Sequence, residues 1–483
     1  MGTSRVYFTS NATRLLSAGA YLEKQFRKRV IHELVDCRFR FVAPSYGCDA
    51  VTVLAHALAA RRLEREQAAG VVIGLVIDVI LVREGVLGLL GGLLIAAWAV
   101  WALAFLRRAA TLRALGRLRT ARPVGDYPAS RALTPGLVAK ITREQQGSGD
   151  TILYGGYFPF VGAGWPLPGW SIAELLIPAR PGPAVIPFTV IELTEYIAKG
   201  LREQLQGDVV SRGRVQHLTI ERRSYSGAGL APVRSRTDAE AVEFQDGRER
   251  YDATREYLCI RVGAWDEELV ISMFVGFDLR GNTLYFEFHP CVLPPVRTSF
   301  HLVDRLPARL TPQLLLRVAW HVPFTLIRGA FAAVVGGAAR LVRWGLRQGR
   351  AAVSLEPVFD NSEFRLGRYA PDLTDRGARF SVRELAAASQ FHHFFQEEDQ
   401  AKYVKIVERQ LLAIMGEFLT EHNVDLGDHN RNQASIIDAS TRNFRKVNRS
   451  VAIARDDRIV CLRSLPCTGG APRHDGVGIL SGT

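Results

Sequence analysis

The chain of 483 residues lacks the short motifs by which most enzymes and metal sites are recognised. Its six cysteines include no C-x-x-C pair, so we expect reduced thiols and neither a disulfide framework nor a zinc ribbon. There is no G-x-x-x-x-G-K-[ST] loop for nucleotide phosphates and no G-x-S-x-G nucleophile elbow. Residues 1–20 have neither the apolar core nor the cleavage pattern of a signal peptide. We predict no cofactor, and an intracellular location for most of the chain.

Lysine is also scarce, with 7 lysines against 54 arginines, a bias that is typical of a GC-rich genome. The placement of charge is therefore more informative than the net charge of +13. Two stretches free of acidic residues, 107–122 and 328–350, hold eleven arginines. Such clusters are attracted to anionic lipid headgroups, whereas the stacking aromatics of a nucleic-acid site are missing from the first. The predicted membrane-surface residues are Arg107, Arg108, Arg113, Arg117, Arg119, Arg122, Arg340, Arg343, Arg347 and Arg350.

One long apolar run occupies residues 70–106, interrupted only by Arg83 and Glu84. The second piece, 85–106, is long enough to span a bilayer, which takes about 20 helical residues. Arginines flank the run on both sides, and this favours a transmembrane hairpin with both ends in the cytoplasm. A single span and a buried soluble hairpin are the alternatives. Asp78 lies inside the shorter piece; it would pair with Arg83 or a partner's membrane helix, or lie near headgroups.

The region after the run has the pattern of a mixed α/β domain. Alternating and β-branched residues predict an antiparallel meander over Glu256–Val262, Glu267–Phe277 and Thr283–Leu293. A capping box formed by Thr189 and Glu192 predicts the start of a helix.

Helical patterns return in the carboxy-terminal part of the chain. Ser381 and Glu384 form a second capping box, and a helix over 396–421 follows with an apolar stripe. This stripe is either intramolecular core or the seam of a homo-oligomer. Arginines at helical spacing within 308–352 predict a basic amphipathic helix, either in the membrane interface or packed on its own domain.

The predicted fold is a membrane-anchored α+β protein. It has an N-terminal transmembrane helical hairpin or single span, a mixed α/β domain with an antiparallel meander, and a C-terminal helical region. The expected segments are an N-terminal cytoplasmic segment (1–69), the transmembrane hairpin (70–106), a basic juxtamembrane linker (107–148), the α/β domain (149–307), the basic amphipathic segment (308–352), the helical region (353–426) and a polar, disordered tail (427–483).

Candidate catalytic and metal-binding residues are few. Cys259, His289 and Cys291 fall on the meander, where a thiol could meet an imidazole, although buried inert cysteines are the usual outcome. We predict no metal site, because helix-surface contacts explain the two acidic and histidine-rich groups equally well. Those groups are His393 and Glu397 with His392 or Glu398, and His422, Asp425, Asp428 and His429.

Several phrases resemble an uncharacterised family of actinobacterial membrane proteins. They include PFVGAG, FTVIELTEYI and GNTLYFEFHPCVLPP, within residues 151–307. The resemblance implies a membrane location and a high-GC source, and it transfers no activity or site residue.

Two function classes follow from these observations. The first is a membrane-anchored interaction or scaffold protein that presents a cytoplasmic α/β domain at the inner leaflet of the bacterial cell membrane. Its expected partners are anionic membrane lipid and an unidentified protein. The alternative is a membrane-associated enzyme that acts on a lipid or envelope precursor.

Overall fold

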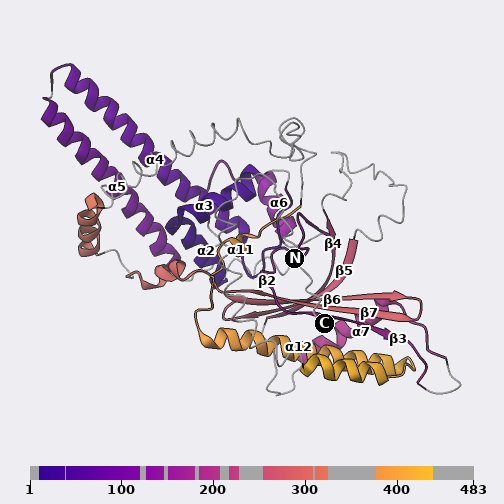
Figure 1. Cartoon of the computed structure of the whole chain (residues 1–483). Coiled ribbons are helices and arrows are strands. Elements are labelled where there is room, and N and C mark those ends of the chain that lie inside the picture. The colour runs from indigo at the N-terminus through magenta and orange to yellow at the C-terminus, as the bar shows by residue number, and fades with distance from the viewer. Residues whose placement is uncertain are drawn as a thin grey trace, which may run out of the picture.

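The computed structural model is a mixed α+β protein with a long helical hairpin that projects from its body (Figure 1). It describes residues 10–37, 40–86, 88–119, 127–145, 151–179, 184–206, 217–227, 254–307, 311–324 and 377–438. The helices before the sheet are α2 (Asn11–Leu22), α3 (Lys24–Ile31), the π-helix η1 (His32–Asp36), α4 (Ala50–Arg83), α5 (Leu89–Arg119) and α6 (Pro135–Gln145).

The described strands form one seven-stranded sheet in the order β1-β4-β5-β6-β7-β2, with β3 also paired to β7. Only β1 and β4 run parallel; the other pairs are antiparallel. The strands are β1 (Thr151–Tyr154), β2 (Trp165–Pro166), β3 (Trp170–Leu175), β4 (Leu218–Gly227), β5 (Thr254–Ala264), β6 (Leu269–Arg280) and β7 (Thr283–Leu293).

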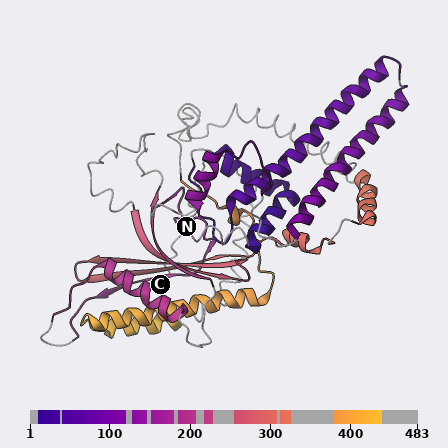
Figure 2. The ribbon, with the colours of Figure 1, turned by 180° about the vertical axis from the view of Figure 1, so that it is seen from behind.

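Helices cover both faces of this sheet, so the body has three layers. On one face lie α7 (Val190–Gln206) and α12 (Phe394–Glu421), as both views show (Figures 1 and 2). Their apolar stripes share a core with β4 to β7. On the other face, Tyr46 and Phe160 pack with Phe274 of β6 in a second core. The 3-10 helix η2 (Thr298–Arg305) follows β7 and packs into the N-terminal helices, and the short α11 (Val382–Leu385) contacts α3.

The locally encoded elements were predicted correctly. All three meander strands are present, and β7 has the predicted bounds Thr283–Leu293. The Thr189 hydroxyl accepts from the Glu192 amide at 3.2 Å, and the Glu192 carboxylate accepts from the Thr189 amide at 2.8 Å, as a capping box requires. The stripe of α12 is buried core, which agrees with the intramolecular interpretation; it consists of Val407, Leu411, Ile414 and Phe418 with the partly buried Tyr403.

Two segment boundaries need correction. Most described residues of the expected linker 107–148 are helical, because α5 continues to Arg119 with Leu115 and Leu118 buried in the N-terminal core, and α6 follows. The expected tail also begins too early: residues 427–438 are helical, and His429 is buried there. The polar composition of these residues hid the helix, since only His429 and Ile436 of residues 427–438 are buried. Arg122, the arginines at 340–350 and residues 439–483 lie outside the described residues.

Candidate functional site

Helices α4 and α5 form an antiparallel hairpin that extends far beyond the body (Figures 1 and 2). The chain reverses after Arg83, where Gly85 has a φ of +72°, a backbone conformation that glycine adopts without strain. From Leu89 to Arg107, the apolar part of α5 spans about 27 Å at 1.5 Å per residue. By length and composition, α5 is the one described helix that could cross a membrane.

The outer half of this hairpin exposes large apolar side chains on all sides. The exposed fractions of these side chains run from 42% to 79%, whereas large apolar residues are most often buried in a hydrophobic core. A continuous apolar surface of this kind marks an interaction site for a membrane or another protein. The residues are Val72, Ile73, Leu75, Val76, Ile77, Val79, Ile80, Val86, Leu89, Leu90, Leu93, Leu94, Ile95 and Trp98.

Small residues hold the two helices of the hairpin close together. A Cβ placed on Gly92 of α5 would lie 2.5 Å from a methyl group of Val82, and one on Gly74 would lie 3.9 Å from the Cβ of Ala99. Asp78 is buried at this seam and faces the Gly92 position. The polar residue flagged in the sequence therefore points towards the neighbouring helix instead of the surrounding solvent.

An aromatic band marks the lower end of the apolar surface. The indole N–H of Trp101 donates to the carbonyl oxygen of Ala319 at 3.0 Å, which attaches helical residues 312–324 to α5. Trp98 on α5 and Trp320 on the attached segment are both largely exposed. Tryptophan side chains with an apolar body and a polar N–H favour the boundary between lipid and water.

Basic residues follow directly below this band. Arg107 donates to Gln67 across the hairpin at 2.8 Å, and Arg113 is exposed one and a half turns further along α5. A hollow of about 500 Å³ opens at the same level beside α4. Its lining contains five basic side chains and the carboxylates Asp36 and Glu64; the basic residues are Lys24, Arg27, Lys28, Arg61 and Arg65.

The structure separates the thiol and the imidazole of the sequence hypothesis. Cys259 on β5 and His289 on β7 both pair with Phe274 of the intervening strand β6. Burial raises the pKa of the Cys259 thiol and raises that of Cys291 well above its usual value. A nucleophilic cysteine needs the opposite shift. His289 instead lies 3.2 Å from the Glu287 carboxylate.

Three of the other histidines considered from the sequence, His393, His422 and His429, make contacts within the local structure. His393 caps α12 and stacks on Trp265, while His422 stacks on Phe418. His429 contacts the buried carboxylate of Glu174 at 3.1 Å and the carbonyl oxygen of Leu412. These contacts engage the three imidazoles in packing or hydrogen bonding within the fold.

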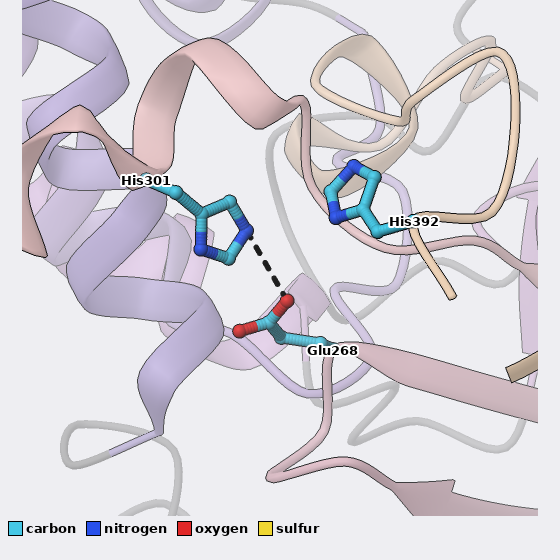
Figure 3. Close-up of side chains that lie close together, drawn as sticks. All are labelled: Glu268, His301 and His392. Carbon is cyan, nitrogen blue, oxygen red and sulfur yellow. Dashed lines mark ion pairs between the residues drawn. The ribbon is translucent and has the colours of Figure 1, made fainter. Parts of the chain in front are cut away.

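One group that the sequence did not indicate brings Glu268, His301 and His392 together (Figure 3). One potential ligand atom from each residue lies within 4.8 Å of the other two. Glu268 precedes β6, His301 lies in η2, and His392 precedes α12. The antiparallel bridge between Val296 and Ala387 brings the last two segments side by side. Separations of 33 and 91 residues along the chain left no local pattern to reveal this group.

The electrostatics of this group differ from one imidazole to the other. The hydrogen-bonding and charge interaction with Glu268 raises the pKa of His301. Burial lowers the pKa of His392, and the charge of His301 lowers it further. The Glu268 carboxylate also accepts from the side-chain amide of Asn11 at 2.5 Å. The group is therefore polar, partly buried and fixed to the N-terminal helices.

Comparison with known proteins identifies the domain that carries this group. Residues 169–451 match the family model described as the AbeC-like domain, and they include Glu268, His301 and His392. The hairpin precedes the matched region. Neither the curated proteins nor the solved structures contain a match. Because more than half of its residues match this model, the chain belongs to the AbeC-like domain family.

Proposed function

We propose that the protein is a membrane-anchored interaction protein, in which the α4–α5 hairpin inserts into the bilayer and holds the α/β body at the inner leaflet. The single observation that carries this proposal is the apolar outer half of the hairpin, which is exposed on all sides. Along α5, about 14 Å separate Leu89 from Trp98 of the aromatic band, and about 27 Å separate Leu89 from Arg107. The hairpin is therefore long enough to enter the bilayer above the band, and with the stretch down to Arg107 it approaches the hydrocarbon thickness of about 30 Å.

The order of side chains along the hairpin supports the same orientation. Apolar residues lie at the tip, Trp98 and Trp320 form the band below, and Arg107 and the basic hollow come next. Lipid, interface and headgroup layers of a membrane follow in that sequence. Arginines near the base of both helices favour a cytoplasmic body, and anionic headgroups are the lipid class that the hollow would attract.

Charge insertion on the hairpin tests the anchor. Leu94→Arg with Val79→Arg places two charges in the apolar surface, at a cost of about 2.5 to 3.5 kcal/mol each in lipid. We expect this variant to move from the membrane to the soluble fraction after an alkaline wash. Ile191→Arg on α7 is the control, because Ile191 is exposed on the body. Equal retention of both variants, or complete wash-off of the unaltered protein, would refute the anchor.

Vesicle binding tests the anionic headgroups separately. Lys28→Glu with Arg65→Glu reverses two charges of the basic hollow, and Lys199→Glu with Lys402→Glu makes the same change in net charge on the body. We expect only the first pair to lower binding to anionic vesicles by about tenfold or more, since each charge contributes about 1 kcal/mol. Binding to neutral vesicles should be unaffected. An equal loss in both pairs would point to net charge alone.

The alternative proposal is an enzyme that acts on a lipid or envelope precursor. The group Glu268, His301 and His392 is the observation that supports it, because such side chains carry acid–base or metal chemistry. Replacing Cys259 and His289 by alanine tests the thiol version of this proposal. Unchanged cellular function in that double variant would argue against nucleophilic chemistry on the meander.

A further inference from the structure

We infer that Glu268, His301 and His392 bind one divalent metal ion of the zinc class. Two imidazole nitrogens and a carboxylate oxygen are a donor set that zinc accepts, with a fourth position left for water. This site lies outside the hairpin and does not require membrane insertion.

The distances within the group support this inference. Nε2 of His301 lies 3.3 Å from the Oε2 atom of Glu268. Two ligand atoms of a tetrahedral zinc ion are about 3.3 Å apart when each lies at about 2.05 Å from the metal. This pair is therefore already at the required spacing. The remaining ligand atom lies within 4.8 Å, so His392 would approach by at most about 1.5 Å, which side-chain rotation allows.

The orientation of each side chain also fits. Nε2 of His301 is buried and forms the ion pair with the Glu268 carboxylate that is drawn in Figure 3, so this nitrogen faces the group. In Figure 3, the His392 ring lies to the right of His301 and above Glu268. The hydroxyl of Thr298 contacts Nε2 of His392 at 3.1 Å. When this nitrogen donates to Thr298, Nδ1 is left as the metal ligand.

Surrounding residues supply the second set of contacts that metal ligands usually have. Nδ1 of His301 faces the Asp304 carboxylate at 3.7 Å, an arrangement that orients a zinc-binding imidazole. Asn11 donates to the Oε1 atom of Glu268 and leaves Oε2 for the metal. Arg14 forms an ion pair with Asp304 and holds this carboxylate beside His301.

The backbone before Glu268 is unusually strained. Trp265, Asp266 and Glu267 all have positive φ, between 52° and 64°, although none is a glycine. Non-glycine residues with positive φ are uncommon in proteins. They cluster at functional sites, where the surrounding structure holds them in this conformation. This turn between β5 and β6 directs Glu268 towards η2 and the segment that carries His392 (Figure 3).

Metal analysis of the full chain in mild detergent tests the inference. The protein carries a tag without histidine, and Cys461 and Cys467 are replaced by serine so that these thiols contribute no ligands. After treatment with a chelator, the chain is titrated with zinc, and bound metal is measured by mass spectrometry. Cobalt replaces zinc in a parallel titration, because tetrahedral cobalt reports its nitrogen and oxygen ligands by visible absorption. We expect one equivalent of metal per chain.

Variants assign the metal to this group. His392→Ala, Glu268→Gln and His301→Ala should each weaken zinc affinity by more than about 100-fold, and Asn11→Ala by about 10- to 100-fold. His289→Ala is the matched control, since His289 also pairs with a glutamate but is not part of the group. Circular dichroism is used to check that each variant is folded. Because His392 is only partly buried, we expect the His392→Ala variant to fold.

Two results would overturn the inference. One is an unaltered chain that binds less than a tenth of an equivalent of zinc or cobalt. The other is a His392→Ala variant that binds metal as tightly as the His289→Ala control. In either case His301 and Glu268 form an ordinary ion pair. Neither result bears on the anchor, because membrane retention is measured separately.

Discussion

The indole N–H of Trp101 donates to the carbonyl oxygen of Ala319, 218 residues further along the chain. This bond attaches helical residues 312–324 to the hairpin just below its apolar surface. The segment contributes the exposed Leu316, Trp320 and Phe324 to that level of the molecule. The hairpin, which consists of two helices consecutive in sequence, thus has a third element at its base.

Tryptophan fluorescence should report this arrangement. In vesicles with brominated acyl chains, Trp98 and Trp320 lie near the quencher if the hairpin inserts to the proposed depth. We expect Trp98→Phe with Trp320→Phe to remove most of the quenching. Trp265→Phe is the control, because Trp265 is exposed on the body at 41%. Quenching that is lost only in the control would place the body, and not the hairpin base, in the membrane.

A disulfide across the hairpin should form readily. The Cβ position of residue 74 lies 3.9 Å from the Cβ of Ala99, within the usual range of about 3.5 to 4.5 Å for a disulfide. Gly74→Cys with Ala99→Cys should therefore cross-link within one chain under mild oxidation, seen as a mobility shift that a reductant reverses. The two single variants, Gly74→Cys and Ala99→Cys, are the controls, because neither can form this disulfide alone. A single span with residues 70–82 packed elsewhere predicts no cross-link.

Thiol labelling should separate the four described cysteines by burial. Cys37 is partly exposed, whereas Cys48, Cys259 and Cys291 are buried. Burial raises the pKa of Cys48 to about 12 and raises those of the other two buried thiols. We expect an alkylating reagent to modify Cys37 in the folded chain and the three others only after denaturation, as measured by peptide mass spectrometry. Rapid labelling of Cys259 in the folded chain would instead support the hypothesis that Cys259 is a catalytic nucleophile.

The buried pair of His429 and Glu174 should make stability depend on pH. Burial alone would lower the pKa of His429, but the hydrogen bond and charge of Glu174 outweigh it and raise that pKa above 6.5. The stabilisation is therefore fully present below pH 6.5 and is lost as the pH rises through the raised value.

Urea denaturation in mild detergent measures this effect. At pH 6, His429→Gln should lower the free energy of unfolding by about 3 kcal/mol, because it leaves Glu174 buried without its cationic partner. At pH 8.5 we expect the difference between the two proteins to be smaller. A difference that stays constant between these pH values would contradict the raised pKa. His422→Gln is the control, since His422 is a partly buried histidine at the end of α12 that contacts the ring and carbonyl oxygen of Phe418 instead of a buried carboxylate.

The glycines of the phrase PFVGAG show how far a sequence pattern can be interpreted. The sequence showed that this phrase belongs to a stretch that resembles a known group. It did not show why glycines are needed there. In the structure, Gly164 has a φ of +87°, and a Cβ there would lie 2.3 Å from the Val292 carbonyl oxygen. Gly162 and Gly164 both donate their amides to the buried carboxylate of Glu384. That carboxylate belongs to the capping box that the sequence did predict.

By itself the sequence determined what depends on neighbouring residues. The apolar run, the three meander strands, the two capping boxes and the stripe of α12 are local patterns, because strand and helix periodicity is set within a few residues. These patterns were sufficient for the α+β class and for the surface that we propose as the anchor.

The tertiary structure alone decided which distant side chains meet. The turn before Glu268, the helix η2 after β7 and the bridge from Val296 to Ala387 together form the group with His301 and His392. The sequence paired His392 with its neighbours in α12, whereas the fold turns it towards β6 and η2. Strand register and helix packing fix such contacts through many weak interactions across the chain, and no short stretch of residues records their sum.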